Sequence, residues 1–346
     1  MIQPMDVRKM VRKSVLDLKP YSSARDEFEG EASVFLDANE SPYPTEFNRY
    51  PDPHQRQLKK RICEIKGGSP EELFLGNGSD EAIDLLFRAF CEPGIDEVLI
   101  PEPTYGMYAV SAAVNNIAVR SVSLTPDFDI NVDAVLKAAT PNTKIIFLCS
   151  PNNPSGNLLD AAKITQVIDN FPGIIVVDEA YIDFAGSPSF LQSLSRFNNL
   201  VVLQTLSKAW GMAGLRIGMC FANRDLIAVL NKIKPPYNIS GIAQQIAFEK
   251  LKDPATKENH VREILAQRKL MREELTNLKI VKRVFPSDSN FLLADIDQAH
   301  KIYNELITKG IVVRDRSHVK LCRDCLRITI GTPEENQALL SELRKL

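Results

Sequence analysis

The chain has 346 residues, of which 44% are hydrophobic and 25% are charged, and its formal net charge is −2 at pH 7. This composition is typical of a globular protein of about two domains and excludes a disordered or collagen-like chain. The near balance of charges argues against nucleic acid or an anionic membrane surface as the main partner.

The sequence also argues against insertion into a membrane and against secretion. No apolar run approaches the ~20 residues that a membrane-spanning helix needs, and the charged N-terminal segment lacks the apolar core of a secretory signal. Six cysteines are too few for a disulfide framework in a chain of this length. We therefore expect a cytoplasmic protein.

Short apolar runs alternate with amphipathic stretches between about residues 70 and 230. The expected strands are 96–100, 117–122, 144–148, 174–177 and 200–203. The expected helices between them are 79–90, 105–115, 132–139 and 160–170. Continuous apolar strands separated by helices predict a mainly parallel sheet that is covered on both faces.

The pattern changes after Pro235 and Pro236. The long charged stretch over 241–278 is expected to be helical. It is followed by an expected strand at 290–294, a helix at 296–309 and strands at 311–314 and 326–330. This order predicts a second, smaller α+β domain.

A lysine motif follows the expected strand 200–203. The sequence TLSKAWGMAGLR (205–216) puts Ser207 and Lys208 near the carboxyl end of that strand, where open α/β sheets bind ligands. A lysine there can form a Schiff base with an aldehyde cofactor, and Ser207 and Arg216 can contact a phosphate. The surrounding glycines indicate tight turns near a ligand and disfavour a plain surface lysine.

An acidic residue ends the neighbouring strand, in the sequence IIVVDEAY (174–181). A buried carboxylate needs a cationic partner, and the protonated nitrogen of a pyridine ring would serve Asp178. Tyr181 could donate a hydrogen bond to the phenolic oxygen of such a ring. Taken alone, an aspartate at a strand end is more often a cap or turn residue.

Two further turns fall at the same edge of the predicted sheet. GNGSDE (76–81) opens a helix at Ser79, whose free backbone N–H groups can bind phosphate. Glu81 breaks the dinucleotide-binding fingerprint, so this turn is not of that type. The loop SPNNPSG (150–156) presents Asn153 after strand 144–148.

In the order GSD, PTYG, SPNNPSG, DEAY, SK and R, these motifs resemble the fold-type-I, class II aminotransferases that depend on pyridoxal 5'-phosphate (PLP). The resemblance covers nearly the whole chain. Narrower features resemble the histidinol-phosphate aminotransferase branch: PYSSAR (20–25), NESP (39–42), RYPDP (49–53), PTYGMY (103–108), GIVVRD (310–315) and LRITIGT (326–332).

The resemblance implies an α/β fold whose large PLP-binding domain (46–240) has a mainly parallel central sheet. It implies a small C-terminal α+β domain (241–346) and an N-terminal arm (1–45) that packs on the small domain and on a partner subunit. The implied protein is a homodimer with shared active sites. The implied reaction interconverts L-histidinol phosphate plus 2-oxoglutarate with imidazole-acetol phosphate plus L-glutamate, a step of histidine biosynthesis.

The resemblance also assigns roles at the cofactor. Lys208 matches the lysine that holds PLP as an aldimine and moves the proton. Asp178 matches the residue that pairs with the ring nitrogen, and Tyr181 matches a catalytic residue that contacts the ring oxygen. The other implied cofactor contacts are Ser79, Asp80, Tyr105, Asn153, Ser207, Arg216 and, from the partner subunit, Tyr50.

The implied substrate residues are Tyr21, Asn153, Arg314 and Arg327. Arg327 matches the arginine that binds the α-carboxylate, and Arg314 and Tyr21 join it in receiving the phosphate of histidinol phosphate. Trp210 and Phe291 depart from the branch, which commonly carries Phe and Tyr at these positions. We expect local repacking at the first and the loss of a hydroxyl contact at the second.

Several readings stay open at this point. Another enzyme of the same fold, an aromatic aminotransferase or a threonine-phosphate decarboxylase, would share these motifs. A non-catalytic ligand-binding module is disfavoured by the retained Lys208. His318, Cys322 and Cys325 could supply three zinc ligands, but a closed structural site usually has four, so we interpret the thiols as incidental and expect no metal.

Overall fold

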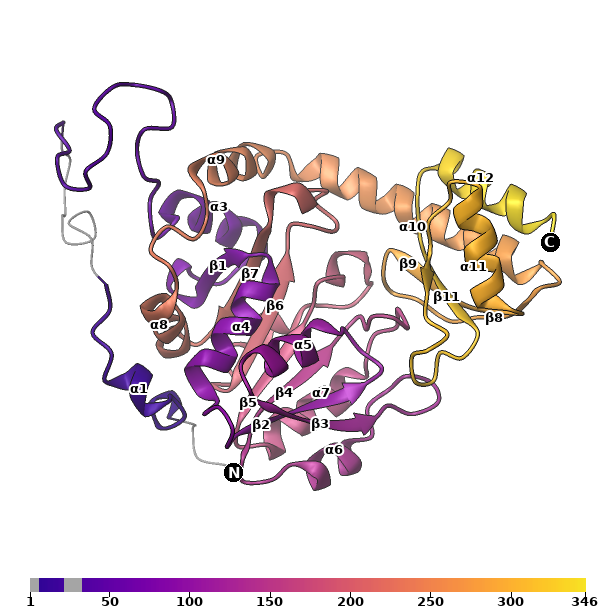
Figure 1. Cartoon of the computed structure of the whole chain (residues 1–346), viewed down its shortest axis with the longest axis horizontal. Helices are drawn as coiled ribbons and strands as arrows, with labels where there is room; N and C mark the ends of the chain where they lie inside the picture. Colours follow the sequence, from indigo (N-terminus) through magenta and orange to yellow (C-terminus); the bar gives the residue numbers. More distant parts are fainter. Residues whose placement is uncertain (1–5, 22–32) are drawn as a thin grey trace.

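The computed structural model describes residues 6–21 and 33–346. Its central sheet consists of β1 (Leu73–Asn77), β2 (Glu97–Glu102), β3 (Ala118–Ser123), β4 (Thr143–Cys149), β5 (Ile174–Asp178), β6 (Leu200–Thr205) and β7 (Ile217–Ala222). The strand order is β1-β7-β6-β5-β4-β2-β3 (Figure 1). Six of these strands run in the same direction, and β7, which lies between β1 and β6, runs in the opposite direction. The mainly parallel sheet is therefore confirmed, although β1 and β7 were not among the expected strands.

The sheet is apolar on both faces because helices cover both. In β4, Ile146 and Leu148 join one buried cluster, and Ile145 and Phe147 join the other. The first cluster is covered by α3 (Arg56–Lys66), α6 (Val132–Ala138) and α7 (Ala161–Asn170). The second is covered by α4 (Ser79–Phe90), α5 (Met107–Val114) and α8 (Arg224–Ile233). Helices α4 to α7 were expected, whereas α3 and α8 were not.

A second, antiparallel sheet lies nearer the C-terminus, with the order β10-β11-β9-β8. Its strands are β8 (Val281–Val284), β9 (Phe291–Ile296), β10 (Arg314–Asp315) and β11 (Cys325–Thr329), and its helices are α11 (Ala299–Thr308) and α12 (Pro333–Leu343). The expected strand over 311–314 is thus wrong in its bounds, since only Arg314 and Asp315 pair with β11.

The helical stretch expected over 241–278 is confirmed, and the chain divides it into α9 (Gly241–Lys250) and α10 (Pro254–Thr276). The Asp253 side chain accepts the N–H of Thr256, and Pro254 occupies the first position of α10. Proline favours the first turn of a helix and cannot continue a preceding one. Helix α9 packs against α3, and the long α10 leads to the second sheet (Figure 1).

Residues 7–16 of the predicted N-terminal arm lie against the helices that cover the large sheet. It contains the short helices η1 (Val7–Lys9) and α1 (Lys13–Leu16), and Val7, Val11 and Val15 are buried in the cluster shared with α4 and α8. This differs from the expected packing on the small domain, which lies at the opposite side of the molecule in Figure 1. Residues 1–5 and 22–32 of the predicted arm lie outside the described residues. Among the described helices, none has both the length and the hydrophobicity to cross a bilayer.

Three short 3-10 helices near the sheet edge complete the large unit: η3 (Ile182–Phe184), η4 (Phe190–Ser193) and η5 (Ala213–Leu215). A fourth, η2 (Pro70–Glu72), leads into β1.

The turn before α4 rests directly on β7. Gly218 of β7 pairs with Gly76 of β1. A Cβ atom at residue 218 would lie 2.1 Å from the backbone nitrogen of Ser79 and 2.2 Å from the carbonyl carbon of Gly78. Only glycine at residue 218 leaves room for this turn.

We therefore expect Gly218→Ala to lower the free energy of unfolding by about 1–3 kcal/mol, the usual cost of overpacking. Denaturant titration measures the change. Gly214→Ala is the matched control, because a Cβ atom at residue 214 has no neighbour within 4 Å. Equal unfolding midpoints for the two variants would contradict the close contact.

Candidate active site

One pocket gathers the chemically functional residues at the carboxyl edge of the parallel strands. It encloses about 520 Å³ of empty space, part of which is open to solvent. Its lining includes most of the cofactor residues implied by the sequence: Ser79, Asp80, Tyr105, Asn153, Asp178, Tyr181, Ser207, Lys208 and Arg216. Thr205 and Cys149 also line the pocket and were not predicted.

The start of α4 forms one wall of the pocket. Gly78 precedes the helix with a φ of 72°, and no side chain caps the first backbone N–H groups. The Gly78 N–H donates to the carbonyl of Arg216 at 2.8 Å, which joins this turn to the loop before β7. A Cβ atom at residue 78 would lie 2.6 Å from the Arg216 guanidinium. Uncapped N–H groups beside an arginine form a site suited to an anion.

Asp178 is buried at the end of β5. Its Oδ2 accepts a hydrogen bond from the Tyr108 hydroxyl at 2.6 Å, and its Oδ1 accepts the Ala180 N–H at 3.1 Å. No ion pair to Asp178 occurs among the described residues. Burial raises the pKa of this carboxyl, and the Tyr108 hydrogen bond opposes that shift. Tyr108 was not among the predicted site residues; it lies three residues beyond Tyr105, on the first turn of α5.

Lys208 lies on the open side of the pocket, with its Nζ 5.5 Å from the centre of the buried Tyr181 ring. Partial desolvation lowers the pKa of the Lys208 amine, and the positive charge of Arg327 adds to this shift. The negative charge of Asp178 acts in the opposite direction. The amine is therefore more readily neutral, and so more nucleophilic, than an ordinary surface lysine.

Hydrogen bonds hold the loops of Tyr105 and Asn153 together. Asn152 is buried, accepts a hydrogen bond from the Thr104 hydroxyl at 3.0 Å and donates to the carbonyl of Pro103 at 2.9 Å. The Tyr105 hydroxyl donates to Asp80 at 3.1 Å. The Tyr105 ring is thereby fixed between two loops that follow different strands.

Arg327 brings the second sheet to the pocket. Its guanidinium donates to Oδ1 of Asn153 at 2.5 Å and lies 5.3 Å from the centre of the Phe291 ring. Phe291 in turn packs edge-on against Tyr181 at 5.2 Å. Phe291 thus supports the arginine and the tyrosine through its ring alone.

Arg327 reaches the pocket through its contact with Asn153 and is not itself part of the lining, and three further predicted residues do not line the pocket either. Tyr21 is 73% exposed, and Arg314 is exposed on β10. Tyr50 is half exposed and stacks on Tyr237 at 4.4 Å, beside a separate groove. Their assigned roles stay predictions.

The cysteine motif does not form a metal site among the described residues. Cys322 and Cys325 are buried free thiols, and His318 lies instead near His300 and Asp315 at the surface. His300 Nδ1 is 2.8 Å from the Asp315 carboxylate.

Trp210 is buried two residues after Lys208. Its indole N–H has no hydrogen-bond partner within the described chain, and the Lys257 amine lies 5.5 Å from its ring.

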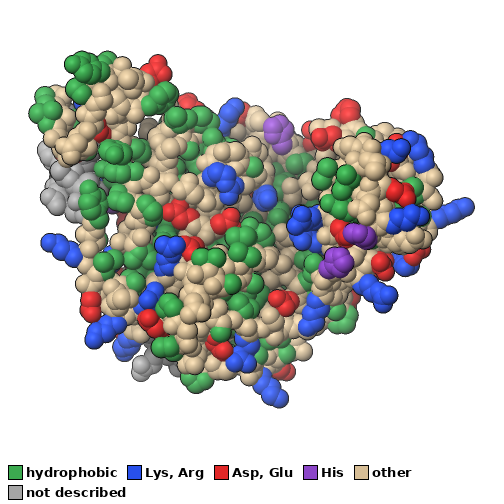
Figure 2. All heavy atoms as spheres, in the orientation of Figure 1, with side chains coloured by type: hydrophobic (Ala, Val, Ile, Leu, Met, Phe, Trp, Pro, Cys, Tyr) green, Lys and Arg blue, Asp and Glu red, His purple; other side chains and the backbone are tan. Residues whose placement is uncertain are grey.

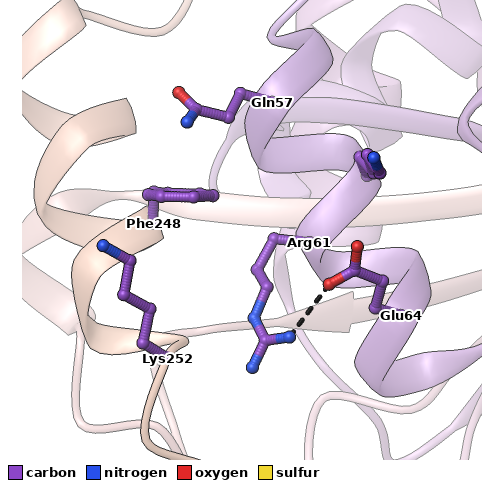
Figure 3. A pocket seen from close by; sticks show the side chains of 6 residues that line it. Gln57, Arg61, Glu64, Phe248 and Lys252 are labelled. Carbon is purple, nitrogen blue, oxygen red and sulfur yellow. Dashed lines mark hydrogen bonds and ion pairs between the residues drawn. The ribbon is translucent and has the colours of Figure 1, made fainter.

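A second pocket lies between α3 and α9 and is lined by Gln57, Lys60, Arg61, Glu64, Phe248 and Lys252 (Figure 3). Arg61 donates to the carbonyl of Leu251 at 2.9 Å and pairs with Glu64 at 2.9 Å. This arginine joins the two helices, and none of the predicted site residues lines the pocket.

The comparisons with known proteins agree with this geometry. A family model described as aminotransferase class I and II matches residues 34–343. A histidinol-phosphate aminotransferase of Parabacteroides distasonis is 56% identical over 341 residues, which cover 99% of each chain.

Solved structures show the same fold. The histidinol-phosphate aminotransferase of Clostridium acetobutylicum has a TM-score of 0.79 at 27% identity and covers 87% of this chain and 91% of its own. That of Sinorhizobium meliloti, in complex with pyridoxal-5'-phosphate, has a TM-score of 0.80 at 23% identity and covers 89% of both chains. The chain therefore belongs to the class I and II aminotransferases and, within them, to the family of the histidinol-phosphate aminotransferases.

Proposed function

We propose that this protein is a PLP-dependent transaminase that moves an amino group between L-histidinol phosphate and 2-oxoglutarate. The observation that carries the proposal is the buried Asp178 carboxylate, which has no ion-pair partner among the described residues and lines the same pocket as Lys208. A buried carboxylate of this kind is stabilised by a cation that arrives with a ligand.

The residues of the pocket fit PLP. The uncapped start of α4 (Ser79 and Asp80), together with Ser207 and Arg216, would hold the phosphate. Asp178 would pair with the protonated ring nitrogen. Tyr105 would stack on the ring, and Asn153 and Tyr181 would contact its oxygen. Lys208 Nζ would hold the cofactor covalently.

When bound, PLP withdraws electrons from the bonds at the α-carbon of the amine substrate. Asp178 keeps the ring nitrogen charged, and Tyr108 holds that carboxylate in place. The Lys208 amine, whose pKa is lowered by burial, takes the proton from the α-carbon of the donor and returns one to the acceptor. Arg327 binds the carboxylate of glutamate, and Arg314 and Tyr21 contribute to the phosphate site.

We also propose a homodimer in which Tyr50 reaches the phosphate site of the neighbouring subunit. Large hydrophobic side chains are exposed in the segment that precedes Tyr50 in the sequence: Val34, Phe35, Leu36, Tyr43 and Phe47. Hydrophobic atoms also gather on the protruding segment in Figure 2. Exposed apolar surface of this kind is typical of a protein interface.

A cytoplasmic location is supported by the six free cysteines.

The direct test is an amino-transfer assay with 2-oxoglutarate as acceptor and four donors: histidinol phosphate, phenylalanine, tyrosine and phosphothreonine. We expect kcat/KM for histidinol phosphate to exceed kcat/KM for phenylalanine and for tyrosine by at least about 100-fold, because a charge-assisted phosphate contact contributes about 1.5–3 kcal/mol and at least two are available. Formation of glutamate is measured.

A preference for phenylalanine or tyrosine, or carbon dioxide release from phosphothreonine, would contradict the proposal. Lys208→Ala is the control and should abolish transfer.

Borohydride reduction of the parent holoprotein followed by peptide mapping should locate the cofactor on Lys208, and a label on another lysine would overturn that assignment.

Replacing Asp178 by Asn should weaken PLP binding by at least about tenfold, since a neutral amide cannot hold the ring nitrogen in its charged form. The same change should stabilise the cofactor-free protein. Burial raises the pKa of Asp178, so the carboxyl favours folding most at low pH, and this contribution is lost as pH rises through the raised pKa. The gain in Tm of the variant over the parent should therefore be larger at pH 8 than at pH 5.

Thermal unfolding without cofactor and spectral titration with PLP measure the two effects. Asp127→Asn is the control, because the Asp127 side chain is 84% exposed, and it should change neither quantity. Undiminished PLP affinity in Asp178→Asn would exclude the proposed pairing.

The shared site can be tested by mixing Lys208→Ala with Tyr50→Ala. Each variant alone is expected to have little activity, whereas hybrid dimers hold one site with both residues intact. Random exchange should restore about one quarter of the parent activity, because half of the dimers are hybrids and each has one intact site of two. Subunit exchange confirmed by mass spectrometry without recovery would disprove sharing through Tyr50.

A further inference from the structure

Three arginines come together on one face of the second sheet. Arg314 of β10 lies directly opposite Arg327 of β11 in the strand pairing, so their side chains share a face. Arg316 follows Arg314 by two residues and keeps that orientation, because side chains alternate along an extended chain. The Arg316 N–H donates to the carbonyl of Cys325 at 2.9 Å, which continues the pairing by one step.

This face is directed toward the large sheet. Cys325 and Leu293 belong to the buried cluster of the large sheet that α3, α6 and α7 cover. Leu326 and Ile328, on the other face, belong to the core of the second sheet. Arg327 extends from the first of these faces to Asn153. Arg316 lies near the same place, because the charges of both Arg316 and Arg327 act on the Tyr181 hydroxyl.

No carboxylate neutralises the three guanidinium groups within the described residues. Asp315, which lies between Arg314 and Arg316 in the sequence, alternates to the opposite face. There it accepts the Ser317 N–H at 2.8 Å and contacts His300. Arg316 forms neither an ion pair nor a side-chain hydrogen bond in the described chain. The Nε atoms of Arg316 and Arg327 are both buried without an acceptor.

Such an arrangement is costly unless an anion completes it. Burial lowers the pKa of Arg316, and the neighbouring charges of Arg327 and Arg314 lower it further. Each buried donor without an acceptor loses its hydrogen bonds to water and gains none in return. One guanidinium suffices for the single charge of a carboxylate, so three together suit a ligand with more charge and more oxygen atoms, such as a phosphate monoester.

We propose that Arg316 is a specificity-determining residue that, with Arg314, binds the phosphate group of the amine substrate and leaves Arg327 for the carboxylate of glutamate. This inference rests on the proposed function and adds a residue to it. Arg316 is half-buried and near Tyr181, whereas Arg314 is exposed, so Arg316 provides the contact closer to the reacting groups.

The test uses the holoenzymes of Arg316→Gln and of the matched control Arg323→Gln. Arg323 lies in the same segment with its side chain 96% exposed. We expect Arg316→Gln to lower kcat/KM for histidinol phosphate at least tenfold, equivalent to about 1.4 kcal/mol, and the rate of the glutamate half-reaction by less than about twofold. The control should change neither rate, and Arg316→Lys should recover part of the loss.

Inorganic phosphate is a probe that does not depend on the amine substrate. It should inhibit the glutamate half-reaction of the parent, and its inhibition constant should rise about tenfold in Arg316→Gln. Equal losses with histidinol phosphate and glutamate, or an unchanged phosphate inhibition constant, would overturn the role of Arg316. A parent enzyme that is inhibited by phosphate but does not turn over histidinol phosphate would instead contradict the proposed function and leave the phosphate contact supported.

Discussion

The buried carboxylate of Asp178 is the constraint around which the site is organised. Its neighbour in sequence, Glu179, is equally buried, but donors surround it: the Ser189 hydroxyl, the Phe190 N–H at 2.7 Å and the Gln204 amide at 2.9 Å. Within the described residues, Asp178 accepts hydrogen bonds only from the Tyr108 hydroxyl and from one backbone N–H. Asp178, the last residue of β5, and Glu179, which follows the strand, therefore serve different purposes. Glu179 stabilises the loop of η4, and Asp178 keeps its unmatched charge for a ligand.

Parallel strands explain why the remaining groups collect around this carboxylate. Strands β1, β2, β4, β5 and β6 end at the same edge, and each is followed by a loop that carries a residue of the pocket. Strand β7 runs in the opposite direction and begins at that edge, so Arg216 reaches the pocket from the loop before a strand and not from a loop after one. The second sheet adds Arg327, and its bond to Asn153 joins the two sheets at the pocket.

The sequence predicts much of this arrangement, because motif residues at the ends of apolar strands must meet at one edge. Asp178, Lys208 and Asn153 illustrate this rule. It does not predict β7, in which Gly218 interrupts the run of apolar residues. It also does not predict the break before Pro254, which falls within an otherwise charged helical stretch. Tyr108 and Arg316 were missed for a different reason. Their positions depend on the rotation of α5 and on the pairing of β10 with β11, and neither can be read from local sequence.

Trp210 has a consequence for spectroscopy. It is the only tryptophan in the chain, and it lies between the loop that carries Lys208 and the side chain of Lys257 on α10. The indole emission of the whole protein therefore originates at one point, where the lysine loop meets the helix leading to the second sheet. A change in the packing of α10 against that loop alters the surroundings of this single fluorophore, with no other indole to mask the signal.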